Sequence, residues 1–450
     1  MDTFNENLNE QQAQQPMGCL HRFSKTIKVV IIGLLILLLM IPMFMIENLI
    51  SERGRTQEEA IDEVSEKWSL AQTITGPYLN LQYPVVTENN GEKKVSIKDL
   101  ILFPDELMVN GQLKTEILKR SIYEVNVYQS ELTLKGSFSS EELKKSRIDM
   151  DQLQFDRAAI CLNLTDMRGI SEQISITLGD SVYIFEPGMD NRGIANTGVH
   201  AIANLSELKQ NKKLPYEIKI KLKGSQSLNF IPLGKTTRVD LKANWNTPSF
   251  TGNYLPNNRN ITEKEFSAQW QVLNLNRNYS QVMVDFNTSN IKDIESSSFG
   301  VNFKIPVEQY QQSMRSAKYA ILIILLTFGV IFFTEIMNKT RIHALQYLLV
   351  GLALCLFYSL LLSFSEHVGF NPAYLLSSAL TIILVGGYMF GITKKKKPSL
   401  IMPGLLGILY LYIFVLIQLE TFALLAGSLG LFIILAMVMY FSKKIDWFNE

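Results

Sequence analysis

The stretch from Tyr319 to Phe441 constrains the fold of this chain most strongly, because it is almost continuously apolar and only short polar segments interrupt it. An apolar run of about 18–20 residues can cross a hydrocarbon core as a helix, which rises about 1.5 Å per residue. Another uncharged run of this kind lies near the N-terminus. The six predicted transmembrane helices are Val29–Ile46, Tyr319–Ile336, Leu345–Phe364, Ala373–Ile392, Ile401–Leu419 and Phe422–Phe441.

Basic residues predict the orientation of these spans. They precede the first span and follow the second, fourth and sixth, whereas the segments after the third and fifth spans contain no lysine or arginine. Because basic residues accumulate on the cytoplasmic side, we expect both termini in the cytoplasm and residues 51–316 outside. The first run resembles a signal peptide in its flanks, but Glu47-Asn48-Leu49 offers no small-residue cleavage site, which favours a retained anchor.

The segment 51–316 has the charge distribution of a soluble domain and is expected to begin with a helix. Thr56 and Glu59 form a capping-box pattern. Apolar residues then recur at helical spacing from Ile61 to Ala71, and Gly76-Pro77 is expected to end the helix.

Further along this segment the apolar period changes from helical spacing to two. Apolar and basic residues alternate strictly in Ile218–Lys223, which is typical of a strand with one face in water. Many short strands with one clear helix favour a sandwich-like antiparallel architecture, and hence an α+β membrane protein with a β-rich extracytoplasmic domain. Similar alternation occurs in Ala158–Leu164, Ile174–Leu178, Arg238–Lys242, Phe266–Val272, Val282–Phe286 and Val301–Ile305.

The resulting prediction divides the chain into five parts. They are a disordered cytoplasmic tail (1–28), a first transmembrane helix (29–46), the β-rich extracytoplasmic domain (51–316), a five-helix transmembrane bundle (319–441) and a second cytoplasmic tail (442–450).

The sequence contains no recognisable catalytic signature. The formal net charge of +1 does not favour nucleic acid as a partner. Cys19, Cys161 and Cys355 lie too far apart for a CxxC zinc site, and only Cys161 belongs to the soluble domain. Neither a GxSxG nor an HExxH motif occurs. We therefore predict no catalytic residue, no metal site and no cofactor.

Polar residues near the membrane boundaries offer two hypotheses. Glu335 and Gln346 lie at the cytoplasmic ends of their spans and are expected to reach the interface, which leaves the deep interior nearly free of charge. The predicted topology places another set near the outer membrane level. These residues either join the end of the soluble domain to the loops of the bundle or are solvated separately. They are Glu47, Arg315, Lys318, Glu366, His367 and Glu420.

Small residues within the bundle predict close helix contacts. Gly387 and Gly391 form a GxxxG pattern in the fourth span, and Gly427 and Gly430 lie together in the sixth. Packing within one chain is the favoured interpretation, with homodimerisation as the alternative.

Several motifs follow one another from about Ala60 to the last span. They include Trp68 with Gln72-Thr73-Ile74-Thr75-Gly76-Pro77, Asp166-Met167-Arg168-Gly169-Ile170, Gly198-Val199-His200-Ala201, Pro232-Leu233-Gly234-Lys235-Thr236-Thr237, Gln346 through Ala353, and Ser365-Glu366-His367. In these motifs the chain resembles the CreD family of inner-membrane cell envelope integrity proteins. One departure is Ser121, where that family usually has glycine, which concerns a local turn.

The resemblance implies a protein of the bacterial inner membrane that takes part in envelope integrity, the envelope stress response and colicin tolerance. It implies no catalytic residues. The favoured hypothesis is a non-enzymatic protein whose periplasmic domain, residues 51–316, binds an envelope protein or a cell-wall component while the bundle contacts the lipid bilayer. The alternatives are a transporter or lipid-handling protein that uses the bundle, and an envelope glycan or lipid hydrolase.

For the favoured hypothesis we expect two surfaces to matter, while the ligand and the oligomeric state are not determined by the sequence. The candidate residues are Asp166, Arg168, His200, Arg315, Lys318, Glu366 and His367.

Overall fold

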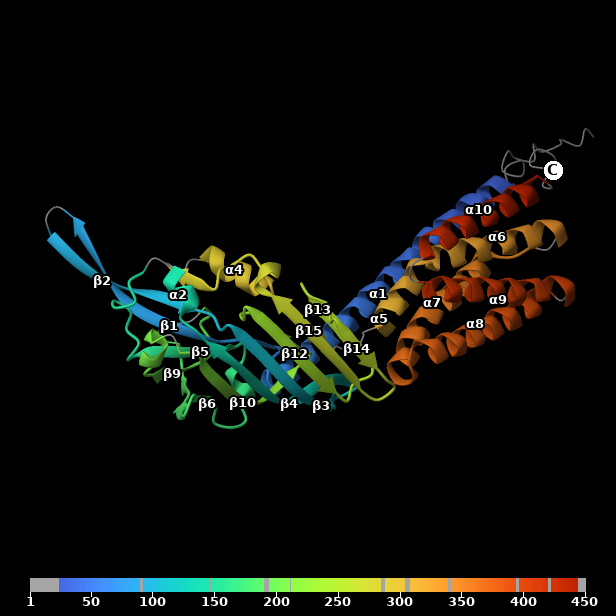
Figure 1. Ribbon diagram of the computed structural model, residues 1–450. Coiled ribbons are helices and arrows are strands. Elements are labelled where there is room, and N and C mark those ends of the chain that lie inside the picture. The colour runs from blue at the N-terminus through green and yellow to red at the C-terminus, as the bar shows by residue number, and fades with distance from the viewer. Residues whose placement is uncertain are drawn as a thin grey trace, which may run out of the picture. The chain divides into compact units, whose positions relative to one another are not determined.

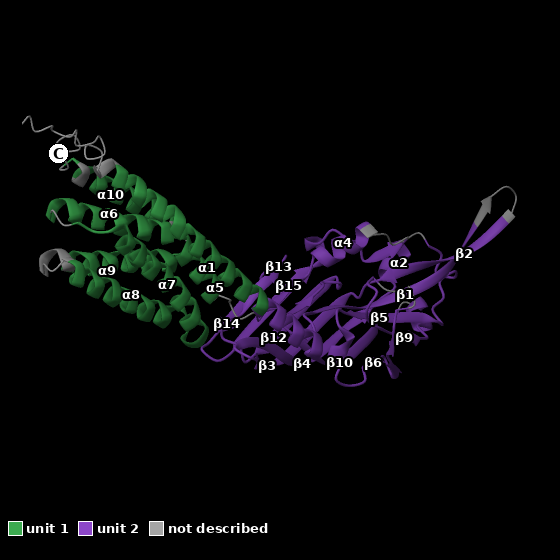
Figure 2. Ribbon diagram, turned by 180° about the vertical axis from the view of Figure 1, so that it is seen from behind, with its two compact units in different colours: residues 1–56, 307–450 green, residues 57–306 purple. Residues whose placement is uncertain are grey.

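The computed structural model shows two compact units, which are described separately below (Figures 1 and 2). Residues 57–306 form the β unit, and residues 1–56 with 307–450 form the helical unit. These limits differ from the expected domain 51–316, because the segment after residue 306 groups with the apolar helices. The structure describes residues 24–89, 92–145, 148–189, 194–210, 212–284, 288–303, 308–338, 341–393, 396–419 and 422–443.

Within its described residues, the β unit contains two sheets (Figure 1). Sheet 1 has the order β13 (Ser249–Gly252), β17 (Phe299–Asn302), β11 (Ser227–Phe230), β1 (Gln72–Asn89), β5 (Ala158–Leu164), β9 (Val199–Ala203) and β8 (Glu186–Pro187), with β2 (Glu92–Leu102) beside β1 and β16 (Val282–Val284) beside β2. Sheet 2 has the order β14 (Asn258–Ile261), β15 (Phe266–Leu273), β12 (Thr236–Ala243), β3 (Glu106–Arg120), β4 (Tyr123–Phe138), β10 (Leu214–Ser225), β6 (Ser175–Leu178) and β7 (Ser181–Ile184).

The two sheets share one hydrophobic core, which confirms the predicted β-rich region. In β3, buried Leu107, Val109 and Leu113 alternate with exposed residues, as a strand with one face in water requires. They belong to the same cluster as Leu79 and Leu81 of β1. Burial of each such leucine contributes about 1.5–3 kcal/mol. The alternating pattern therefore holds sheet 2 against sheet 1 and leaves its other face exposed.

Strand β5 differs from its prediction, because both of its faces are buried. Its bounds are the expected Ala158–Leu164, yet every residue in it is buried. Ala159 and Cys161 face a second apolar cluster on the outer side of sheet 1. That cluster includes Ile294 of α4 (Thr288–Ser296). The expectation of one solvent-facing side was therefore wrong, since loop residues such as Met189 and Ile194, together with Ile294 of α4, cover that side.

The other predicted strands agree with the structure to different degrees. Arg238–Lys242 and Phe266–Val272 lie within β12 and β15, and Ile218–Lys223 lies within β10. The segment predicted at 174–178 begins one residue later, as β6. Residues 285–286 and 304–305 of the two remaining segments lie outside the described residues. The turn at Ser121 has a φ of 58°, a conformation that favours the glycine expected there.

Helix α1 (Ser24–Trp68) is continuous and contributes residues to both units. The predicted start of a second helix at Thr56 is wrong, because Thr56 lies inside α1 and its hydroxyl donates to the carbonyl of Glu52 at 3.0 Å. The helix ends at Trp68, and Gly76-Pro77 lies in β1. Residues 24–28, expected in a disordered tail, are helical, while residues 1–23 and 444–450 lie outside the described part of the chain.

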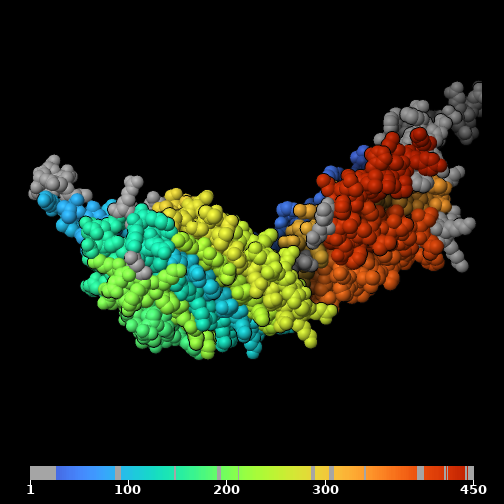
Figure 3. All heavy atoms as spheres, viewed as in Figure 1, coloured from blue at the N-terminus to red at the C-terminus, as the bar shows by residue number. Residues whose placement is uncertain are grey.

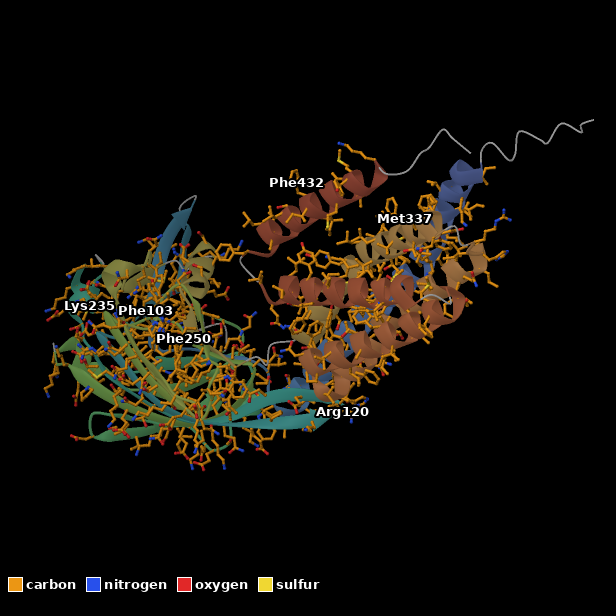
Figure 4. All side chains as sticks on the ribbon, turned by 90° about the vertical axis from the view of Figure 1, so that its right-hand side faces the viewer. Phe103, Arg120, Lys235, Phe250, Met337 and Phe432 are labelled. Carbon is orange, nitrogen blue, oxygen red and sulfur yellow. The ribbon has the colours of Figure 1, made fainter. Side chains whose placement is uncertain are left out.

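The helical unit also contains α5 (Glu308–Lys318), α6 (Ala320–Asn338), α7 (Ala344–Val368), α8 (Phe370–Thr393), α9 (Lys396–Gln418) and α10 (Ala423–Ser442). In the described residues, α1, α6, α7, α8 and α9 are long and apolar enough to cross a membrane. The apolar part of α10, Leu424–Tyr440, is shorter. Exposed Met337 and Phe432 illustrate the apolar surface of this unit (Figure 4). The count of six spans stays a prediction.

Candidate functional site

Asp166 and Arg168 form a charged pair directly after β5. Asp166 caps a short 3-10 helix, Met167–Gly169, and its carboxylate accepts from the backbone N–H of Leu70 at 2.9 Å and from Arg168 Nε at 2.9 Å. Arg168 also donates from Nη1 to the carbonyl of Glu66 at 2.5 Å. Through these hydrogen bonds the pair links the end of α1 to the end of β5.

The charge of Asp166 is compensated by these neighbours. Burial by itself raises the pKa of this carboxyl, but the hydrogen bonds from Arg168 and from the N–H of Leu70 outweigh burial, so its pKa lies below the usual value. An acid that is already satisfied by protein donors has little capacity left for a ligand. The geometry indicates a structural role for this predicted pair.

His200 lies apart from that pair in its contacts. It is buried in β9, opposite Cys161 of β5, and its Nδ1 lies 2.7 Å from the carbonyl oxygen of Gly188. Asp166 and Arg168 contact the segment after α1 instead. The contacts of His200 with Cys161 and Gly188 are therefore different from those of the charged pair.

The predicted residues near the end of α7 lie in the helical unit. The Glu366 carboxylate accepts from the hydroxyl of Tyr310 in α5 at 3.0 Å and lies 3.8 Å from Arg53 Nε of α1. Glu366 therefore joins α7 to α5 and α1 within the helical unit. Its partners differ from those expected, since Arg315, Lys318 and His367 have exposed side chains. Glu420 lies outside the described residues.

Glu335, at the end of α6, is buried among several partners. It is 7% exposed, and its carboxylate is ion-paired with Lys28 of α1. The hydroxyl of Tyr347 and the N–H of Ile342 donate to it, both at 3.1 Å. Glu335 therefore joins the end of α6 to α1 and α7, and its position at the membrane interface stays a prediction.

The glycines that lie at close helix contacts differ in part from those predicted. A side-chain carbon at Gly387 or Gly391 would meet nothing within 4 Å, so packing through this GxxxG pattern is not observed among the described residues. A side-chain carbon at Gly351 would instead overlap with Leu39 of α1, and one at Gly430 would overlap with the Tyr412 hydroxyl. Close helix approach thus occurs at Gly351, which belongs to no GxxxG pattern, and at Gly430.

The outer face of sheet 2 carries a polar groove of about 650 Å³. Figure 3 shows on its visible face the surface of these strands, with β3 and β4 beside β12 and β15. Fourteen residues line the groove: Asn110, Gly111, Gln112, Glu131, Thr133, Asp240, Leu241, Lys242, Asn258, Arg259, Asn260, Ser267, Ala268 and Gln269. We call this feature the sheet 2 groove.

Strand register arranges most of these side chains in two rows across five neighbouring strands. Each row contains one residue from each of β4, β3, β12, β15 and β14, because facing residues in paired strands point to the same side of a sheet. The first row is Thr133, Asn110, Asp240, Gln269 and Asn258, and the second is Glu131, Gln112, Lys242, Ser267 and Asn260.

Part of the groove differs from the rest of the same sheet face, although Glu131 lies 3.9 Å from Lys221 and Asn258 donates to Gln269 at 3.4 Å. On β4 and β10 the outward side chains form ion pairs, such as Lys135–Glu217 at 3.1 Å, and Lys221 pairs with Glu172 at 2.8 Å. In the groove no hydrogen bond or ion pair to another described residue engages the side chains of Asn110, Gln112 or Asp240. These groups therefore retain donors and acceptors that a ligand can use.

The groove carries mixed charge and holds no metal-ligand cluster. Glu131 and Asp240 supply two negative charges and Lys242 one positive charge, whereas Arg259 pairs with core-facing Ala268 and so points to the opposite face of the sheet. Among the described residues, no group of three or more histidine, cysteine or acidic side chains is placed to hold a metal ion. The arrangement is suited to hydrogen bonding with an uncharged polar ligand.

Comparison with known proteins identifies the family of this chain. The family model described as "Inner membrane protein CreD" matches residues 24–448. The inner membrane protein CreD of Escherichia coli (strain K12) is 32% identical over 420 residues, which is 92% of this chain and 91% of that relative. This agreement confirms the resemblance drawn from the motifs. The chain therefore belongs to the CreD family of inner membrane proteins.

Proposed function

We propose that this CreD-family protein maintains cell envelope integrity by binding an envelope component in its β unit, and that it does so without catalysis. The unpaired amide and carboxylate groups of the sheet 2 groove are the observation that carries the proposal. They offer a preformed set of donors and acceptors on a rigid sheet, as polar binding sites require. The family resemblance supports a role in envelope stress and in colicin tolerance.

The proposal places the β unit in the periplasm and both termini in the cytoplasm. The distribution of lysine and arginine between the apolar helices supports this orientation. In this arrangement the helical unit anchors the protein in the bilayer, and the groove is exposed to envelope polymers and proteins.

The test uses complementation in a bacterium that lacks its own CreD protein. A groove variant combines Asn110→Ala and Gln112→Ala, and a control variant combines Gln129→Ala and Lys219→Ala on the same sheet. All four side chains are exposed and none lies in the core, so each change should alter stability by about 0.5 kcal/mol or less.

We expect the wild type and the control variant to restore resistance to detergent and to dye uptake, and the groove variant to fail at equal membrane abundance. Full restoration by the groove variant would remove the groove from the function.

A further inference from the structure

We propose that the sheet 2 groove binds a neutral glycan that carries hydroxyl and N-acetyl groups. This inference rests on the proposed function and adds the chemical class of the ligand. Its basis is the combination of the amides of Asn110 and Gln112 and the carboxylate of Asp240, which no described residue engages, in a groove of mixed charge.

The amide side chains match the hydrogen-bonding groups of such a sugar. Each carboxamide carries one oxygen acceptor and two N–H donors. A sugar hydroxyl both donates and accepts, and an N-acetyl group presents one N–H and one C=O. Asn110 and Gln112 lie on β3, second in each row, and Asn258 and Asn260 lie on β14, where the rows end. Asn258 donates to the side-chain oxygen of Gln269 at 3.4 Å, whereas the amides of Asn110 and Gln112 have no described partner.

The dimensions of the rows fit an extended chain of sugar rings. Five adjacent strands enclose four steps of about 4.8 Å, so each row extends for roughly 19 Å. The second row runs parallel to the first, two residues along each strand. A linear glycan lying across the strands would therefore meet a side chain from every strand that it crosses.

The charge of the groove argues against a polyanionic ligand. Glu131 and Asp240 would repel successive phosphate or carboxylate groups, whereas Lys242 could attract only some of them. The carboxylate of Asp240, which no described residue engages, is suited to accept hydrogen bonds from sugar hydroxyls.

The groove is a poor match for a protein partner. The energetic centres of protein interfaces are enriched in aromatic residues and in apolar contacts. None of the lining residues is aromatic, and Leu241, which lies among them, has a buried side chain.

Because the groove offers hydrogen bonds and few apolar contacts, its affinity for a single oligosaccharide should be modest, with a Kd on the order of 0.1–1 mM.

The experiment titrates the intact protein in detergent micelles with oligosaccharides of equal length by isothermal titration calorimetry. The probes are a β-1,4-linked tetramer of N-acetylglucosamine, cellotetraose and tetragalacturonate. We expect the N-acetylated tetramer to bind most tightly and tetragalacturonate most weakly. The Asn110→Ala/Gln112→Ala variant should weaken the binding of the N-acetylated tetramer at least tenfold.

Gln129→Ala provides the matched control, because Gln129 is an exposed glutamine of β4 that does not line the groove. It should leave the affinity within twofold. Near-identical circular dichroism and melting temperatures would show that the variants are folded. The proposal is overturned if tetragalacturonate binds best, if no sugar binds at 10 mM, or if the groove variant and the Gln129 control lose equal affinity.

The same variants separate this inference from the proposed function. If the groove variant fails in complementation but no sugar binds, the function stands and the ligand class is wrong. If the sugar binds in the groove but the groove variant complements fully, the ligand class stands and the envelope role of the groove is wrong.

Discussion

Buried charge in this protein is held by short-range partners. Asp166 receives donors from the end of α1 and from Arg168, and Glu335 receives them from Lys28 and Tyr347. A carboxylate without such donors would be costly to bury. Both residues therefore contribute to the positions of neighbouring elements, and neither presents an open binding group.

We expect Asp166→Ala to loosen the attachment between α1 and β5. The change leaves the N–H of Leu70 and the guanidinium of Arg168 without this acceptor, at a cost of about 2–3 kcal/mol. Hydrogen–deuterium exchange of the intact protein should show at least tenfold faster exchange in residues 66–72. Asp180→Ala, at an exposed turn, is the control and should leave that exchange unchanged.

The effect of Asp166→Ala should depend on pH in a defined direction. The folded-state pKa of Asp166 is lowered, so the ionised form contributes stability above the unfolded value of about 3.9. That contribution is lost as the pH falls through the folded pKa. The exchange difference between wild type and variant should therefore be complete at pH 7 and shrink below about pH 4. An equal difference at pH 3 would contradict this account.

Some glycines of the helical unit lie where a larger side chain would collide with a neighbouring helix, and others do not. A side-chain carbon at Gly351 of α7 would overlap with Leu39 of α1 and would lie 2.9 Å from the ring of Phe328 of α6. Gly387 of α8 has open space around the same position. The GxxxG spacing therefore did not identify the close contact within this chain.

We expect Gly351→Leu to destabilise the intact protein in detergent by about 1–3 kcal/mol, because the added side chain collides with α1 and α6. Gly387→Leu is the matched control and should leave the melting temperature within about 1–2 °C, since a leucine there can face the surrounding detergent. A loss at Gly387→Leu equal to that at Gly351→Leu would contradict this assignment.

Strand prediction succeeded for elements whose residues alternate simply and failed elsewhere. β12 and β15 follow the expected alternation, but the long strands β1 to β4 were not predicted individually. β1 contains Gly76-Pro77 and Pro84, which usually indicate a turn or a strand edge. Pairing with β2 and β5 holds this segment in the sheet despite those residues. Tertiary pairing thus outweighed local preference.

At the scale of the whole molecule, the proposed orientation can be tested with single cysteines. In a Cys19→Ser background, Asp180→Cys places a thiol on the β unit and Lys443→Cys places one after α10, both at exposed positions. An impermeant maleimide should label Asp180→Cys in intact spheroplasts, and Lys443→Cys only after the membrane is opened. Cys161 and Cys355 are buried and should stay unlabelled in the folded protein. The reverse labelling pattern would contradict the orientation.

The sequence by itself determined the properties that depend on contiguous residues. The apolar runs of the helical unit, the alternation in β12 and the family motifs can all be read along the chain, because transfer into a bilayer and burial of one strand face depend on local composition. The sequence also predicted separate helices before and after residue 50. That prediction was wrong, because no strong helix breaker ends α1 there.

Only the tertiary structure decided which distant residues meet. Lys28 and Glu335 are 307 positions apart and form one partly buried ion pair. The rows of the sheet 2 groove combine residues from β4, β3, β12, β15 and β14, and their alignment depends on strand order and register. Since a shift of one residue would turn each side chain to the opposite face, this groove could not be inferred from the sequence.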